Sequence, residues 1–285
     1  MTFIMSAPFE HGLYIVATPI GNLGDLSRRG EEILAAADLI LVEDSRVTGK
    51  LLNHIDKKKK MMVYNDHKGE QARQEILAAA RCKIVALVSD AGTPLISDPG
   101  YKLVRDARTA GIYVTTVPGP SAVIAALTLS GLPSDRFLFE GFLPSKSKAR
   151  GAALAELKPI KATLIFYENG SRLGAMLADA HDNLGDREGA VIREITKKFE
   201  ETVTGKLSDL AARYASEKPK GEIVVVIGPP GEDAPASSED IEAALRLALE
   251  RLPAAKAAGE VARAFGADRK ALYDLANRWK AEREK

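Results

Sequence analysis

The chain has 285 residues, enough for about two domains, and its 40 Lys and Arg residues nearly balance its 39 Asp and Glu residues. This balance excludes an overall basic field, so contacts with nucleic acid would have to come from local patches. The single cysteine, Cys82, excludes a disulfide framework, and the four scattered histidines predict no metal site. Because no apolar run is long enough to span a bilayer and the N-terminus does not resemble a leader, we expect a cytoplasmic protein without a membrane partner.

The first part of the chain, residues 1–132, alternates short apolar runs with amphipathic segments. Helical spacing between the runs predicts βαβ units and a mostly parallel sheet. Ligands of such domains bind at the carboxyl ends of the strands. The predicted strands are residues 13–17, 39–42, 61–64, 83–88 and 112–117.

The next part, residues 133–230, reads as a second α/β domain. Alternation in FEETVT (199–204) favours some antiparallel pairing, so a mixed sheet is expected. Its predicted strands are residues 136–142, 162–168, 189–195, 199–205 and 221–228.

A Pro-, Gly- and Ser-rich linker at 228–240 leads to a helical tail, residues 238–285. Two of its helices flank a Gly-Ala-Asp turn at 266–268, as in a helix-turn-helix. From Ala254 onward the tail holds eight Lys and Arg against five Asp and Glu, a net charge of +3. This charge is compatible with RNA contact, and packing of a helical hairpin on the second domain is an equal alternative.

Four loops after predicted strands have the composition of a binding site: TPIGNLGD (18–25), EDSR (43–46), SDAGTP (89–94) and PGPS (118–121). Asp90 follows a buried strand, where its carboxylate could accept hydrogen bonds from a ligand, so we predict that it faces one. Asp25, Asp98 and Ser121 are predicted to cap the helices that follow. Neither G-x-G-x-x-G nor G-x-x-x-x-G-K-[ST] occurs, which removes the usual nicotinamide and P-loop signatures. Glu43, Asp44 and Arg46 are expected to form a structural ion-pair group.

Six segments carry a more specific signal: LYIVATPIGNLGDLSRRGEEIL, DLILVEDSRVTGKLL, ALVSDAGTPLISDPGYKLVR, VPGPSAVIAALTLSGLPSDRFLFEGFLPSKSKAR, TLIFYENGSRL and REITKKFEET. Together they resemble a known family. They are similar to the ribosomal small subunit methyltransferase I group of the tetrapyrrole methylase superfamily over residues 13 to about 228, and the tail is similar too. The resemblance implies two α/β domains with S-adenosylmethionine in the cleft between them. It further implies a homodimer that methylates the 2'-hydroxyl of the cytidine at position 1402 of 16S rRNA in the 30S subunit.

Matching positions carry the family's cofactor contacts onto this sequence. The S-adenosylmethionine residues expected from the resemblance are Pro19, Gly21, Asp90, Ala91, Gly92, Ser121, Ala122, Phe166, Tyr167, Ile195 and Thr196.

The acceptor hydroxyl needs a group that takes or shares its proton, and the sequence does not single one out. The candidates among the loop ends are Asp25, Glu168, Glu194 and Lys197. RNA is expected to be held by local positive charge, since phosphate contacts dominate such affinity. The residues predicted to make these contacts are Arg28, Arg29, Lys146, Lys148, Arg150 and Lys197.

Two other functions stay open at this point. One is a methyltransferase that uses S-adenosylmethionine on a tetrapyrrole-like small molecule. The other is a non-catalytic RNA-binding regulator built around the helical tail.

Overall fold

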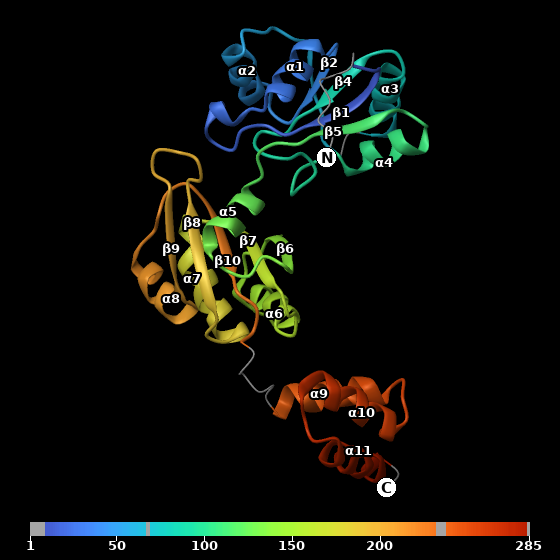
Figure 1. The fold of residues 1–285 in the computed structure, drawn as a ribbon, viewed down its shortest axis with the longest axis vertical. Coiled ribbons are helices and arrows are strands. Elements are labelled where there is room, and N and C mark those ends of the chain that lie inside the picture. The colour runs from blue at the N-terminus through green and yellow to red at the C-terminus, as the bar shows by residue number, and fades with distance from the viewer. Residues whose placement is uncertain (1–8, 67–68, 232–237, 284–285) are drawn as a thin grey trace. The chain divides into compact units, whose positions relative to one another are not determined.

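The structure is a computed structural model that describes residues 9–66, 69–231 and 238–283. The chain divides into two compact units, one ending at Pro229 and the other beginning at Pro230. The first unit holds two five-stranded sheets with helices on their faces, and the second is helical (Figure 1). The expected class, a parallel-sheet domain followed by a mixed-sheet domain and a helical appendage, is confirmed.

The first sheet has the strand order β3-β2-β4-β1-β5, and all its pairs are parallel. All five strands lie where the apolar runs predict them. Their bounds are β1 Gly12–Val16, β2 Leu39–Val42, β3 Met61–Val63, β4 Ile84–Leu87 and β5 Val114–Val117. The connecting helices are η1 Leu23–Asp25, α1 Arg28–Ala36, α2 Ser45–His54, α3 Glu70–Ala80 and α4 Tyr101–Thr109.

Side-chain alternation along these strands gives the sheet two apolar faces. Tyr14 and Val16 of β1 pack with residues of α1 and α2, whereas Leu13 packs with residues of α3 and α4. A parallel sheet covered on both faces needs apolar residues at consecutive positions, as LILV in β2 shows. Helices therefore cover both faces of the sheet, and the loops lie at the carboxyl ends of its strands.

The second sheet has the order β6-β7-β10-β8-β9. Only β6 and β7 pair in parallel, and the other pairs are antiparallel, which confirms the expected mixed sheet. Its strands are β6 Phe137–Phe142, β7 Thr163–Asn169, β8 Glu188–Arg193, β9 Glu201–Lys206 and β10 Glu222–Ile227. Its helices are α6 Ser147–Leu157, α7 Gly170–Leu184 and α8 Leu207–Ser216.

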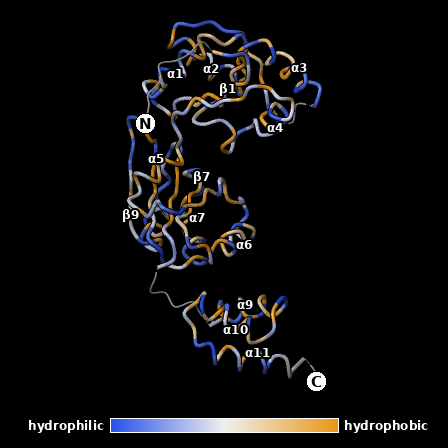
Figure 2. The backbone as a smooth tube through the Cα atoms, turned by 45° about the vertical axis from the view of Figure 1, so that its right-hand side comes forward, coloured by the Kyte–Doolittle hydropathy of each residue, from blue (hydrophilic) through white to orange (hydrophobic). Residues whose placement is uncertain are grey.

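One face of this sheet packs on α6, α7 and α8, and the other on α5, Ala122–Ser130. The sequence of α5, AVIAALTLS, is almost wholly apolar (Figure 2). Although α5 directly follows the last strand of the first sheet, Val123, Ala126 and Leu127 are buried against β7, β8 and β10. The chain therefore crosses to the second sheet before residue 133, where the sequence places the domain boundary.

The second unit consists of α9 Ser238–Leu249, α10 Ala254–Phe265 and α11 Arg269–Arg283. Gly266 ends α10 in the left-handed region, with φ of 64°, and begins the expected turn. The three helices share an apolar core of their own that includes Leu245, Val261 and Leu272. The middle of the predicted linker, residues 232–237, lies outside the described residues. None of the helices in the described ranges combines the length and apolar character that crossing a bilayer requires.

Two predicted helix caps are wrong. Ser27, and not Asp25, caps α1 by accepting a hydrogen bond from the amide of Gly30. Asp98 does not cap α4, because Gly100 occupies the cap position and donates its amide hydrogen to Asp66. Ser121 does precede α5, but its side chain makes no capping hydrogen bond. Asp98 and Ser121 thereby keep polar groups for another use.

The contact between α7 and α8 gives a stability prediction. A Cβ at Gly174 would overlap the carbonyl oxygen of Tyr214, which belongs to the backbone of α8 and cannot rotate away. Gly174→Ala should therefore lower the free energy of unfolding by about 1–3 kcal/mol, measured by denaturant titration.

Gly49→Ala in α2 is the matched control, because no atom lies within 4 Å of the added methyl group. This change should instead raise the free energy of unfolding by about 0.5–1 kcal/mol through helix propensity. Equal effects of the two substitutions would contradict the packing of α7 on α8.

Candidate functional site

The loop after β4 joins the other loops at the same edge of the first sheet. Thr18, after β1, and Gly92 exchange two backbone hydrogen bonds of 2.9 and 3.0 Å. Asp90 accepts a hydrogen bond of 3.0 Å from the amide of Asp44, after β2. Thr93 donates its hydroxyl hydrogen to the carbonyl of Pro120, after β5, at 3.0 Å. The four loops singled out from the sequence thus meet.

The path of this loop requires left-handed backbone. Gly92 has φ of 78°, and the non-glycine residues Leu95 and Ser97 have φ of 75° and 64°. Such conformations cost non-glycine residues free energy and concentrate at functional sites. A Cβ on Gly92 would come within 3.3 Å of the side chain of Ile20, so glycine also keeps the space beside Ile20 open.

A pocket of about 240 Å³ lies against this loop. Its walls come from both sheets and are largely apolar, with hydroxyl, carboxyl and amide groups among them. The lining residues are Ile20, Ala91, Gly92, Thr93, Ile96, Ser97, Asp98, Ser121, Ala122, Phe142, Tyr167, Glu168, Asn169, Ile195, Glu222, Ile223 and Val224. A concave apolar site with a few polar groups is the usual form of a small-ligand site.

Aromatic rings form one wall of the pocket. The ring of Tyr167 meets Phe139 and Phe142 edge-on, at centroid distances of 4.9 and 5.5 Å. Burial raises the pKa of Tyr167 to about 12, and the negative charges of Asp98 and Glu222 add to the effect. Tyr167 is therefore a neutral hydroxyl group at physiological pH.

Carboxylates lie together at the edge of the pocket. Burial raises the pKa of Asp98, a hydrogen bond from Ser89 opposes the rise, and the charge of Asp90 adds to it. Burial likewise raises the pKa of Glu43, followed by the charges of Asp98 and Asp90. Each of these carboxylates thus makes ionisation of its neighbours less favourable.

The expected ion-pair group is confirmed in one part. Arg46 donates hydrogen bonds to the Asp44 carboxylate, and these bonds hold the pKa of Asp44 down at about 2. Glu43 has no ion pair among the described residues, and the charges of Asp98, Asp90 and Asp44 all raise its pKa.

Lys197 links the two sheets beside the pocket. Its ammonium group donates to Glu194 at 2.9 Å and to Glu222 at 2.8 Å. Burial opposes its charge, but these two hydrogen bonds outweigh burial, so the pKa of Lys197 is raised. Its aliphatic stem occupies the space where a Cβ of Gly21 would lie. The bond from Lys197 also lowers the pKa of Glu194, which makes Glu194 a weaker base.

Comparison with known proteins decides the family. Residues 12–211 match the profile of the Tetrapyrrole (Corrin/Porphyrin) Methylases, and residues 235–280 match the RsmI C-terminal HTH domain. A protein named Ribosomal RNA small subunit methyltransferase I from Erythrobacter litoralis is 56% identical over 94% of this chain and 95% of its own. The chain belongs to the ribosomal RNA small subunit methyltransferase I group of the tetrapyrrole methylases.

More distant relatives of this tetrapyrrole methylase agree. The proteins of that name from Mesorhizobium japonicum and Escherichia coli O157:H7 are 48% and 44% identical, over 95% and 93% of this chain and 93% and 94% of their own. Among solved structures, a diphthine synthase has a TM-score of 0.59 at 16% identity, covering 76% of this chain and 89% of its own. A cobalt precorrin-4 methyltransferase has a TM-score of 0.56 at 19% identity, covering 76% and 94%. These two likenesses support the fold.

The structure of this methylase brings some of the expected cofactor residues to the pocket and leaves others out. Six of them line it: Ala91, Gly92, Ser121, Ala122, Tyr167 and Ile195. Pro19, Gly21, Asp90 and Thr196 are not among the lining residues. The Phe166 side chain is fully buried in the core beneath α6, α7 and α8, so the structure does not bring it to the pocket.

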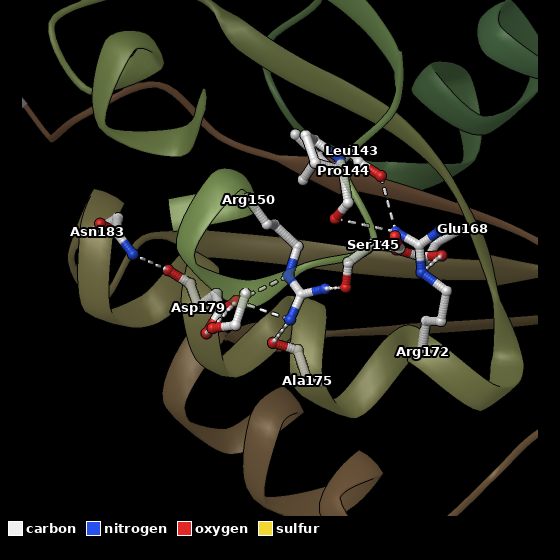
Figure 3. Close-up of polar contacts among 10 residues, drawn as sticks. Leu143, Pro144, Ser145, Arg150, Glu168, Arg172, Ala175, Asp179 and Asn183 are labelled. Atoms are coloured by element: carbon white, nitrogen blue, oxygen red, sulfur yellow. Dashed lines mark hydrogen bonds and ion pairs between the residues drawn. The ribbon is translucent and has the colours of Figure 1, made fainter. Parts of the chain in front are cut away.

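The structure also distinguishes among the candidates for the proton acceptor by their burial and their hydrogen-bond partners. Asp25 is exposed and does not line the pocket. Glu168 is buried in its lining, accepts from the amide of Asn169 at 2.8 Å, and pairs with Arg172 at 3.2 Å (Figure 3). Alternation along β7 puts the Glu168 side chain on the same face as Phe166, toward α7. Lys197, which is held protonated, is unsuited to accept a proton.

One of the predicted RNA contacts is wrong. Arg150 is only 4% exposed, pairs with Asp179 at 2.7 Å and donates to the carbonyl of Ser145 at 3.1 Å (Figure 3). A guanidinium bound in this way cannot reach a phosphate. The positions of Arg28, Arg29, Lys146 and Lys148 on the surface are compatible with the prediction, and Arg28 pairs there with Glu32.

Pocket residues that the sequence did not assign to a ligand include Asp98, Phe142 and Glu222. A signal for Asp98 was present, because it shares with Asp90 the loop after β4, and helix capping was the competing explanation. Phe142 ends a strand with an aromatic side chain next to a Pro-Ser-Lys segment. Among the described residues, no group of His, Cys, Asp and Glu side chains could hold a metal ion.

The raised pKa of Asp98 predicts how stability depends on pH. The folded protein binds a proton at Asp98 more tightly than the unfolded chain does, so this residue costs stability as pH rises through its folded-state pKa. Asp98→Asn removes that cost. Its Tm should exceed the wild-type Tm at pH 7, and the difference should shrink on acidification, as the wild-type carboxyl takes up its proton.

Asp186→Asn should show the opposite sign. Hydrogen bonds from the Ser208 amide and hydroxyl lower the pKa of Asp186, so its charge stabilises the fold at pH 7. This control should have a lower Tm than the wild type at pH 7 and approach it on acidification. A lower Tm for Asp98→Asn at pH 7 would contradict the burial of Asp98.

Proposed function

We propose that the chain is an S-adenosylmethionine-dependent methyltransferase that modifies the 2'-hydroxyl of the cytidine at position 1402 of 16S rRNA in the small ribosomal subunit. The proposal rests chiefly on the two-sheet pocket, found in a chain 56% identical to a ribosomal RNA small subunit methyltransferase I. The sequence resemblance supplies two finer details, the sugar hydroxyl and a homodimer, and the cytoplasmic location comes from the absence of a long apolar run in the sequence.

The pocket fits S-adenosylmethionine in chemistry. Ile20, Ile195 and Val224 offer apolar walls to an adenine ring, and the Ser121 hydroxyl is not used in capping the helix. Asp98 and Glu222 provide negative charge toward a cationic ligand. When bound, the cofactor supplies a methyl group on a positively charged sulfur.

The described residues supply position and a proton acceptor. Hydrogen bonds from the loop after β4 fix three neighbouring loops, and such positioning can contribute several kcal/mol to a group transfer. A sugar hydroxyl reacts faster if a carboxylate takes its proton, and a raised pKa makes a carboxylate a stronger base. Asp98 combines this property with a place in the pocket lining, so we assign the proton to it.

RNA contact is assigned to local positive charge, as expected from the near-neutral composition. Lys146 and Lys148 are exposed and follow the pocket residue Phe142 by a few positions, while Arg28 and Arg29 lie at the start of α1. Such side chains contact phosphates without reading sequence.

Methyl transfer to unmethylated 30S subunits tests the proposal. Incubation with labelled S-adenosylmethionine should put label into 16S rRNA, and nuclease digestion with mass spectrometry should identify 2'-O-methylcytidine. Asp98→Asn should lower kcat by about 10²- to 10⁴-fold, while calorimetry shows S-adenosylhomocysteine still bound.

A tetrapyrrole substrate in parallel reactions is the comparison that decides between the two methyltransferase functions. Label in the ring compound and none in the RNA would overturn the proposal. If the folded wild-type protein gives no heat of binding with S-adenosylhomocysteine, the assignment of S-adenosylmethionine as cofactor is contradicted as well.

Truncation separates an enzyme from an RNA-binding regulator. Because the first unit has core clusters of its own, a chain ending at Pro229 should fold and bind S-adenosylhomocysteine with unchanged affinity. Its affinity for 30S subunits should fall, since the removed residues from Ala254 onward carry a net charge of +3. Loss of cofactor binding with the tail removed would contradict the assignment of the pocket to the first unit.

A further inference from the structure

Phe142 is a large aromatic residue that the fold leaves open to solvent at the pocket. Its exposed fraction is 56%, although it lines the pocket and its ring meets Tyr167 edge-on at 5.5 Å. An aromatic side chain normally gains stability by burial, so one held half in water beside a ligand site has a face available for a partner.

The backbone around Phe142 places it at this edge of the site. β6 is the outer strand of its sheet and is bonded only to β7, with a register shift between Phe139 and Gly141. Gly141 adopts φ of 76°, and a Cβ there would come within 3.3 Å of the Ser97 hydroxyl. The shift thus brings the end of β6 against the loop after β4.

Two inward-facing arginines fix the chain that follows Phe142 (Figure 3). Arg172 donates to the carbonyls of Leu143 and Pro144, at 2.7 and 3.4 Å, while pairing with Glu168. Arg150 donates in the same way to Ser145, the next residue along the chain. The backbone of residues 143–145 is therefore held from within the domain. A ligand meeting Phe142 finds a preorganised segment, which lowers the entropic cost of binding.

The charge next to this segment indicates the class of partner. Lys146 and Lys148 are exposed, and the nearby arginines are already used internally. An exposed ring beside a pair of lysines suits unpaired RNA, in which a base stacks on an aromatic side chain and the phosphates meet ammonium groups. A second copy of this chain would have to bring acidic groups against the same lysines.

We propose that Phe142 stacks on an unpaired base of the RNA substrate at the pocket, with Lys146 and Lys148 on the adjoining phosphates. This inference rests on the proposed function and adds to it a residue that binds the nucleotide to be modified. It also implies that the target is recognised as an unstacked, single-stranded nucleotide.

Binding of a fluorescein-labelled RNA from the decoding region of 16S rRNA, measured without cofactor, tests the stacking role. Phe142→Ala should weaken binding about tenfold to a hundredfold, the range for loss of one base–aromatic stack. Phe142→Tyr should bind like the wild type, whereas Phe142→Leu should resemble the alanine variant. Phe137→Ala is the matched control, because Phe137 is 42% exposed at the other end of the same strand and does not line the pocket.

Salt dependence distinguishes stacking from charge. Phe142→Ala should shift the plot of log affinity against log salt without changing its slope. The double variant Lys146→Ala, Lys148→Ala should reduce the slope by about 1.4, the value for two phosphate contacts on a single strand.

Fluorescence of a pyrrolo-cytidine at the target position reports stacking of that base. The fluorescence should fall when the RNA binds the wild type or Phe142→Tyr, and should stay unchanged when it binds Phe142→Ala.

Other outcomes would overturn the inference. Unchanged RNA affinity of Phe142→Ala, or an equal loss in Phe137→Ala, would exclude a stacking role. Dissociation of a dimer by Phe142→Ala in sedimentation, with RNA affinity following only the loss of dimer, would assign this face to a second copy instead. If the wild type methylates RNA but Phe142→Ala binds RNA with unchanged affinity, only this inference is contradicted. If the wild type does not methylate RNA, the proposed function is contradicted.

Discussion

The hydrogen bonds of the loop after β4 are the constraint on which the pocket depends. Gly92, Asp90 and Thr93 each bind a different neighbouring loop, so the ends of β1, β2 and β5 are held at one place. The path of the loop includes positive φ angles at Gly92, Leu95, Ser97 and Gly100. Strain of this kind persists only where the surrounding contacts enforce it. The many glycine, proline and aspartate residues of this loop therefore reflect its role in joining the loops after β1, β2 and β5.

The second sheet completes the site through a small number of contacts. Tyr167 and Phe142 supply a wall, Ile195 and Val224 supply another, and Lys197 packs its stem on Gly21 of the first loop. Each contact joins residues distant in sequence, so the pocket is a property of the two sheets together. The acidic residues of the pocket also come from both sheets. Asp98 comes from the first sheet's loops and Glu222 from the second sheet.

The sequence predicts strands well here because each kind of sheet leaves its own pattern of apolar residues. LILV is apolar at every position, as a strand covered on both faces must be, and FEETVT alternates as an edge strand does. Side-chain direction was harder to predict. Phe166 and Tyr167 are neighbours, yet one lies in the core and the other in the pocket, and only the register of β7 decides which. Arg150 looked like a surface cation because its partner, Asp179, lies 29 residues away.

The apolar helix α5 has a consequence for how this protein is made. Its buried face rests on β8 and β10, which are synthesised 60 to 100 residues later than α5 itself. During translation AVIAALTLS therefore lacks the part of its native surface that β8 and β10 supply until the chain has been extended past Ile227. An uncovered apolar segment of this kind is a target for chaperones and a starting point for aggregation. The first sheet can form early, but the apolar face of α5 is covered in full only after β10, the last strand of the second sheet, has been synthesised.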